Sequence, residues 1–184
     1  HYDFDEVHID LRPLCQFAGA RLYHDTANKI DTVNKQVICQ GRPAVPYDVL
    51  SINIGSTPSF DDTEGAAENT TPVKPINNFI NRWQRLVDRV LSSPDSYRIG
   101  VVGAGAGGME LLLAVQYRLG NLLAEQGQSD DGLEFHLVSR SDPILPDFGS
   151  GVRRRFARHI EPRNIHLHNG ATVAEVAPGL LSIV

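Results

Sequence analysis

Apolar residues recur with a helical period after residue 75. One apolar stripe, at spacings of three and four, predicts a helix that Ser92, Ser93 and Pro94 would end. The polar residues Arg82 and Arg85 fall on the opposite face. The stripe consists of Ile76, Phe79, Ile80, Trp83, Leu86, Val87, Val90 and Leu91.

Downstream of this helix, strand-like and helical patterns alternate. We predict a strand over 98–102, a helix over 105–125, a strand over 133–139 and a helix over 150–159. A third strand is expected in "NIHLHNG" and a strand pair in "TVAEVAPGLLSIV". This order predicts an α/β fold with parallel strands joined by right-handed crossovers and flanked by helices.

The N-terminal part reads differently. A short helix is expected in "IDLRPLCQFAGA", followed by strands in "ARLYHDT", "KQVICQ" and "YDVLSINIG". The stretches "NKIDTVN" and "GRPAVP" would be the turns between them. The polar stretch "STPSFDDTEGAAENTTP" reads as a loop or linker. We therefore divide the chain into residues 1–60, a linker at 61–75, and residues 76–184.

Composition narrows the class of protein. The 184 residues are 41% hydrophobic and 21% charged, with a net charge of −5, which is typical of a globular protein and argues against nucleic acid as the main partner. Cys15 and Cys39 form no CxxC pair, and no apolar run approaches the ~20 residues of a membrane span. The chain starts at His1, and its only methionine is Met109, so we expect a segment of a longer protein.

The stretch "RIGVVGAGAGGMELLLAV" carries the main candidate site. Gly103, Gly105 and Gly108 match G-x-G-x-x-G between a predicted strand and a predicted helix, the context that dinucleotide binding requires. Gly103 would permit the sharp turn, Gly105 the approach of a pyrophosphate, and Gly108 close packing of helix and strand. The amides at the helix N-terminus would then face the phosphates. A purely structural glycine bend is the alternative.

The end of the second strand bears on the choice of cofactor. A carboxylate there would accept hydrogen bonds from a ribose 2′-hydroxyl, but this chain has Ser139 followed by Arg140. The pair favours NADPH, or no strong preference, unless Arg140 is only a solvated charge. The same lack of a carboxylate disfavours a SAM-dependent methyltransferase. No lysine follows the glycines, which excludes a P-loop.

Several stretches resemble one known family. "RIGVVGAGAGGMELLLA", "FHLVSRSDPILPDF" and "NIHLHNGATVAEV" resemble the NAD(P)H-binding domain of two-dinucleotide-domain flavoprotein reductases. Gly108-Met109-Glu110, Ile144-Leu145-Pro146 and residues 170–176 carry this match. Upstream, "ANKIDTVNKQVICQGRPAVPYDVLSINIGSTP" is similar to the antiparallel β-meander of the flavin domain. Where that family usually has Ala-Thr-Gly, this chain has Asn53-Ile54-Gly55 and keeps only the glycine.

A narrower resemblance is also present. "YDVLSINIGSTP", "VKPINNFINRW" and "VVGAGAGGMELLLA" look like the pyridine nucleotide-disulfide oxidoreductase-like proteins found attached to, or alongside, selenide, water dikinase. These are relatives of type II NADH dehydrogenases and sulfide:quinone reductases. The resemblance implies a Rossmann-like FAD/NAD(P)-binding fold. Residues 1–60 would then be part of an FAD-binding domain, and residues 76–184 the NAD(P)H-binding domain.

The resemblance implies the following chemistry for the parent protein. NAD(P)H would pass hydride to FAD, and electrons would then reach a quinone, a selenium or sulfur species, or another protein. Ala27 and Gly55 match backbone contacts to FAD, and Glu110 matches a carboxylate near the nicotinamide. No catalytic side chain is assigned. The full set of NAD(P)H-binding candidates is Gly103, Ala104, Gly105, Ala106, Gly107, Gly108, Glu110, Ser139 and Arg140.

Other features and functions stay open. His166 and His168 share a strand face, but a solvated face explains them better than a metal site does, and no metal is expected. A non-catalytic module that senses NAD(P) for another enzyme is the alternative function. We expect a cytoplasmic protein, or one peripheral on the inner face of a membrane. The chain alone would be inactive and would purify without flavin colour.

Overall fold

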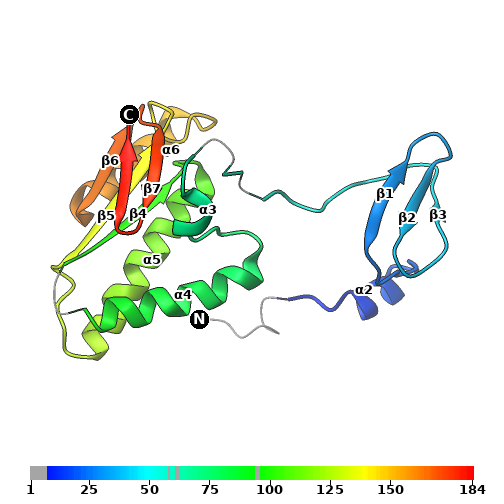
Figure 1. Cartoon of the computed structure of the whole chain (residues 1–184), viewed down its shortest axis with the longest axis horizontal. Helices are drawn as coiled ribbons and strands as arrows, with labels where there is room; N and C mark the ends of the chain where they lie inside the picture. The colour runs from blue at the N-terminus through cyan, green and yellow to red at the C-terminus, as the bar shows by residue number, and fades with distance from the viewer. Residues whose placement is uncertain (1–7, 58, 61–62, 94–95) are drawn as a thin grey trace. The chain divides into compact units, whose positions relative to one another are not determined.

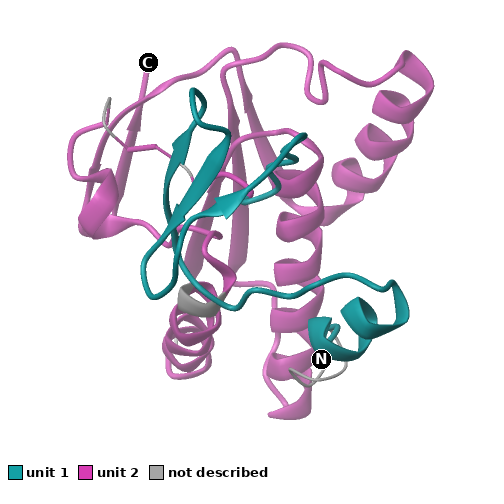
Figure 2. Ribbon diagram, turned by 90° about the vertical axis from the view of Figure 1, so that its right-hand side faces the viewer, with its two compact units in different colours: residues 1–54 teal, residues 55–184 magenta. Residues whose placement is uncertain are grey.

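A computed structural model describes residues 8–57, 59–60, 63–93 and 96–184. The chain forms two compact units, unit 1 (residues 1–54) and unit 2 (residues 55–184), which are coloured separately in Figure 2. Figure 1 labels their helices and strands.

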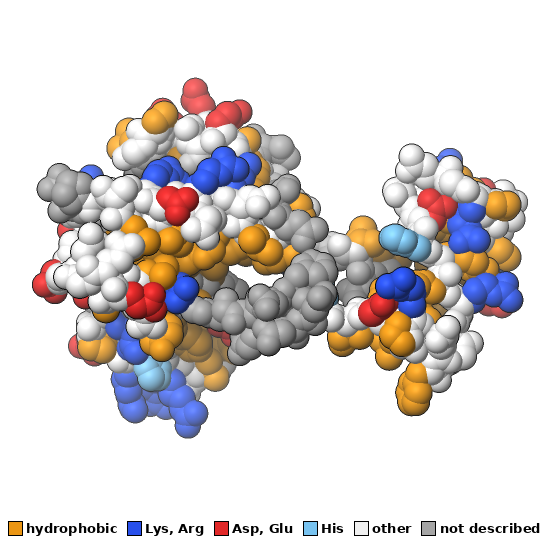
Figure 3. Space-filling view, turned by 90° about the horizontal axis from the view of Figure 1, so that it is seen from below, with side chains coloured by type: hydrophobic (Ala, Val, Ile, Leu, Met, Phe, Trp, Pro, Cys, Tyr) orange, Lys and Arg blue, Asp and Glu red, His pale blue; other side chains and the backbone are white. Residues whose placement is uncertain are grey.

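Unit 1 contains one short helix and a three-stranded antiparallel sheet. Helix α2 (Leu11–Phe17) begins after Asp10, whose carboxylate accepts a hydrogen bond from the Arg12 amide at 2.9 Å. Strands β1 (Ala27–Asp31), β2 (Gln36–Cys39) and β3 (Val45–Pro46) pair in the order β1-β2-β3. The predicted helix is confirmed, and an antiparallel meander is present, with only its middle strand at the predicted position. None of the described residues of unit 1 is buried, and apolar side chains lie on its surface (Figure 3).

The positions of these strands differ from the prediction. "NKIDTVN", expected as a turn, contains most of β1, and β3 lies in "GRPAVP", whereas no strand forms in "ARLYHDT" or in "YDVLSINIG". A local turn at Asp31 explains the shift. Its carboxylate accepts hydrogen bonds from the backbone amides of Asn34 (2.9 Å) and Val33 (3.0 Å) and from the Asn34 side chain (2.8 Å). Four residues thus reverse the chain, and the preceding ones stay extended.

Unit 2 is built on a parallel sheet. Strands β4 (Tyr97–Val102), β5 (Leu133–Ser139) and β6 (Ile165–Asn169) pair in the order β4-β5-β6. They are connected by helix α5 (Ala106–Glu125) and by helix α6 (Ser150–Ile160), which continues into a short 3-10 turn at Glu161–Arg163. The chain ends in a hairpin of β7 (Val173–Ala177) and β8 (Leu180–Ile183). The predicted α/β order and parallel pairing are confirmed.

The core of unit 2 lies between the sheet and the helices α4 (Ile76–Leu91) and α5 (Figure 1). Alternate residues of β5 point into it, and Phe135 and Leu137 are fully buried against α5. The apolar stripe of α4 is only partly used. Its C-terminal half packs through Val87 and Val90, whereas Ile76 and Ile80 remain about half exposed.

A short helix, α3 (Ala66–Asn69), forms inside the stretch that the sequence favoured as loop. It is held to β7 by backbone and side-chain contacts. The Val176 amide donates to the Glu64 carbonyl at 2.9 Å, and the Asn69 side chain donates to the Val176 carbonyl at 3.0 Å. Gly65 lies so close to Val176 that a Cβ would approach its carbonyl oxygen to 2.1 Å. Tertiary contacts therefore select this conformation.

None of the helices within the described ranges is long and apolar enough to cross a membrane.

Candidate nucleotide-binding site

The glycine turn directly follows β4 at the carboxyl edge of the parallel sheet. Gly103 has φ of +110°, and its amide donates to the Val138 carbonyl on β5 at 2.8 Å. A Cβ on Gly103, Gly105 or Gly107 would meet nothing within 4 Å, so one side of the turn faces open space. A Cβ on Gly108 would approach the Gly103 carbonyl oxygen to 1.8 Å. Gly108 is thus required for packing, and the other three leave room for a ligand.

Helix α5 begins within this turn. Gly105 is its N-cap in an extended conformation, and the Met109 amide donates to the Gly105 carbonyl at 3.1 Å. The amides of the first turn have no partner within the helix, and the positive end of the helix dipole lies there. Ala104 is buried in the core and Ala106 is partly buried against it, so the turn offers its backbone rather than side chains. Such an end suits an anion.

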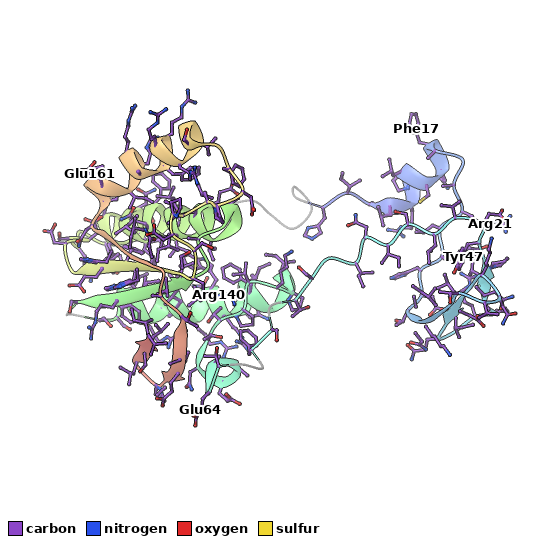
Figure 4. All side chains as sticks on the ribbon, turned by 90° about the horizontal axis from the view of Figure 1, so that it is seen from above. Phe17, Arg21, Tyr47, Glu64, Arg140 and Glu161 are labelled. Carbon is purple, nitrogen blue, oxygen red and sulfur yellow. The ribbon has the colours of Figure 1, made fainter. Side chains whose placement is uncertain are left out.

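The end of β5 lies beside the turn. Val102 pairs with Val138 in the sheet, so Gly103 and Ser139 leave neighbouring strands at the same edge. Ser139 is buried, and its hydroxyl donates to the Ser141 carbonyl and accepts from the Ser141 amide, both at 3.1 Å. Arg140 is exposed at the end of the strand (Figure 4). Of this pair, only the Arg140 side chain is free to reach a ligand.

The remaining candidates lie elsewhere in their units. Glu110 is exposed one turn into α5, on the same helix as the glycine turn. Ala27 is exposed on β1 of unit 1, where it pairs with Cys39. Gly55, at the start of unit 2, is exposed with φ of +74° and open space around its Cβ position. The glycine turn, Ser139 and Arg140 therefore lie at the same edge of the sheet in unit 2, and Glu110 lies one turn along α5. Of the two FAD candidates, Ala27 lies in unit 1 and Gly55 is the first residue of unit 2.

A histidine cluster appears that the sequence revealed only in part. His136 on β5 stacks against His166 on β6 with ring centroids 4.8 Å apart, and its Nδ1 lies 3.1 Å from Nε2 of His168. Burial, followed by the charges of His166 and His168, lowers the pKa of His136, while Glu134 opposes this shift. The parallel register, which pairs His136 with His166, was the missing signal. Within the described ranges, no three His, Cys, Asp or Glu side chains are arranged to hold a metal ion.

Comparison with known proteins identifies the family. The sequence pattern of the pyridine nucleotide-disulphide oxidoreductase family matches residues 16–179. The chain belongs to this family. A curated relative, the NADH dehydrogenase-like protein YutJ of Bacillus subtilis (strain 168), is 26% identical over 152 residues, which cover 83% of this chain and 39% of the relative. The suspected resemblance to this superfamily is confirmed.

Solved structures show the same fold. The sulfide:quinone oxidoreductase from Aquifex aeolicus matches all of this chain and 44% of its own with a TM-score of 0.74 and 20% identity. NDH2 from Plasmodium falciparum, solved in complex with NADH, matches 88% of this chain and 36% of its own with a TM-score of 0.69 and 17% identity. The predicted Rossmann-like FAD/NAD(P)-binding fold is therefore confirmed. The chain spans about two fifths of the length of these relatives.

Proposed function

We propose that this chain is the NAD(P)H-binding part of an FAD-dependent NAD(P)H oxidoreductase. The observation that carries the proposal is the turn at residues 103–108, where open backbone at Gly103, Gly105 and Gly107 meets the N-terminus of α5. The geometry fits a pyrophosphate, which needs close approach to backbone amides without side chains in the way. Membership of the pyridine nucleotide-disulphide oxidoreductase family supports the same conclusion.

In this proposal the chain binds and orients the cofactors. The amides of residues 103–108 hold the pyrophosphate, and Glu110 lies near the nicotinamide end. The backbones of Ala27 and Gly55 contact FAD, and the open space at Gly55 suits such an approach. FAD, when bound, accepts the hydride of NAD(P)H and passes electrons onward. The protein contributes position and exclusion of water.

The strand-end residues favour NADPH. Arg140 is exposed and suits a 2′-phosphate, whereas position 139 has a serine engaged by Ser141 instead of a carboxylate that would accept from a 2′-hydroxyl. We therefore expect NADPH to bind at least as tightly as NADH. This preference would set the reductant but not the electron acceptor.

The electron acceptor is proposed by chemical class only. Cys15 and Cys39 are both unpaired thiols, so they supply no redox disulfide. Electrons would leave the flavin for a quinone, a selenium or sulfur species, or another protein. On the basis of the sequence resemblance, we also propose an association with selenide, water dikinase and a cytoplasmic or membrane-peripheral location. Co-purification with that enzyme would test the association.

Calorimetric titration of the chain with NADPH and with NADH tests the proposal. Binding of either nucleotide supports the proposal. Arg140→Ala should lower the affinity for NADPH more than the affinity for NADH, because only NADPH carries the 2′-phosphate. The matched control is Arg154→Ala, which removes an exposed arginine on α6 and should change neither affinity. A folded chain that binds neither nucleotide contradicts the proposal. Binding of S-adenosylmethionine instead would support the methyltransferase alternative.

The sensing alternative needs the full-length parent. Addition of NADPH should bleach the flavin absorbance of an oxidoreductase, because hydride transfer reduces the flavin. A module that only senses NAD(P) leaves the absorbance unchanged. The present chain is expected to purify without flavin colour, and a stoichiometric bound flavin would contradict that expectation.

A further inference from the structure

The loop between β5 and α6 contains the run Ile144-Leu145-Pro146. It packs against the glycine turn rather than lying free on the surface. Ile144 is 6% exposed and Leu145 is 1% exposed, and both belong to the same core cluster as Ala104. The Leu145 amide donates a hydrogen bond to the Ala104 carbonyl at 3.1 Å. The loop thus contacts the turn through both its side chains and its backbone.

Leu145 makes this contact in an unusual backbone conformation. Its φ is +52°, in the left-handed region that residues with a Cβ rarely adopt. The burial of its side chain compensates for this cost. The Leu145 carbonyl also accepts from the Phe148 amide at 3.0 Å, which fixes the other side of the residue. Strained residues of this kind are often found at functional sites.

The hydrogen bond determines the direction of one peptide plane in the turn. In a trans peptide the carbonyl oxygen and the following N–H point in opposite directions. Because the Ala104 carbonyl is directed to Leu145, the amide of Gly105 points away from the loop. Gly105 itself is exposed, and its Cβ position lies in open space.

We propose that Leu145 is a positioning residue for the nucleotide, which acts by holding the Ala104 carbonyl inward so that the Gly105 amide is presented to the pyrophosphate. This inference rests on the proposed function. Leu145 touches no ligand itself. Its effect requires the left-handed conformation, which directs its own amide at Ala104, and the buried side chain maintains that conformation.

Two substitutions separate this role from core packing. Leu145→Ala and Leu145→Gly both remove the buried side chain, and glycine removes slightly more. Glycine, however, adopts positive φ at no steric cost, whereas alanine adopts it only at a steric cost. We expect Leu145→Ala to weaken NADPH binding on the order of 5- to 30-fold and Leu145→Gly to weaken it less. Thermal stability should fall in both variants, because both lose the buried leucine side chain.

Calorimetry with NADPH and a melting curve on the same samples give both readouts. Ile144→Ala is the matched control, because it removes a buried side chain next to Leu145 but leaves the hydrogen bond from Leu145 to Ala104 in place. It should lower the melting temperature with little effect on the affinity for NADPH. Leu145→Met should bind like the wild type. If affinity falls in the order of lost side-chain volume, with glycine weaker than alanine, Leu145 acts by packing alone and the inference is wrong. If the folded wild type binds neither NADPH nor NADH, the proposed function fails and the inference falls with it.

Discussion

Unit 1 and unit 2 both contain apolar residues, but they bury them very differently. No described residue of unit 1 is buried, and Phe17 and Ile54 are each 91% exposed. In unit 2, by contrast, Met109, Leu112 and Leu119 of α5 are completely buried. A helix and a three-stranded sheet with no core are marginally stable at best. The contrast shows that unit 2 contains its own stabilising core, whereas the meander of unit 1 does not.

The largest effect is expected when one phenylalanine is replaced in each unit. Phe135→Ala, at 1% exposure on β5, should lower the free energy of unfolding by about 3–5 kcal/mol because it leaves a cavity in the core. Phe17→Ala, at 91% exposure on α2, should change it by less than about 0.5 kcal/mol. Urea unfolding is followed by the fluorescence of Trp83, the single tryptophan, which reports on unit 2, and by far-UV circular dichroism, which reports on both units. Equal effects of the two substitutions would contradict the contrast.

A smaller effect is expected from one glycine in each unit. Gly108→Ala should lower the free energy of unfolding of unit 2 by about 1–3 kcal/mol, since its Cβ would clash with the backbone at Gly103. It should also abolish nucleotide binding by displacing α5 from the turn. Gly41→Ala in unit 1 places its Cβ at an ordinary 3.6 Å from the Asp25 carboxylate and is the control. A Gly108→Ala variant as stable as the wild type would show that the turn adapts.

The smallest effect concerns pH. The pKa of His136 is lowered in the folded chain, chiefly by burial. As the pH falls below about 6.5, this histidine therefore becomes protonated in the unfolded state before it does so in the folded state. Unit 2 should therefore lose stability as the pH falls through this value, and it should keep that stability above it. His136→Asn should flatten the pH dependence. His24→Asn in unit 1 removes a histidine outside the cluster and should leave the slope as it is. Urea midpoints at pH 7 and pH 5 measure both.

The sequence predicts an element correctly where local signals agree, and it fails where contacts beyond the local pattern decide the structure. Strand β5 was predicted with its observed ends because its alternation, its flanking turn and its parallel partners all agree. The meander strands were displaced because one Asp31-centred turn decided where the chain reversed. Helix α3 was missed because Gly65 and Asn69 take their positions from contacts with β7, far along the chain.

The candidate site shows the same limit. The spacing of Gly103, Gly105 and Gly108 was enough to predict a strand–turn–helix with a nucleotide-binding geometry. It was not enough to show that the Ser139 hydroxyl is engaged by Ser141, or that His136 joins His166 across the sheet. Such pairings depend on register and loop conformation, which local sequence patterns do not specify.

The sequence by itself determined the α/β order, the parallel sheet and the glycine turn, because hydrophobic period and glycine spacing act over a few residues. The tertiary structure alone decided which apolar faces are buried and how the peptide planes of the glycine turn are directed. Leu145 illustrates the difference, because a leucine in the sequence does not indicate a left-handed backbone conformation. The packing of Ile144 and Leu145 against the turn imposes that conformation, and the Leu145 amide then points at Ala104.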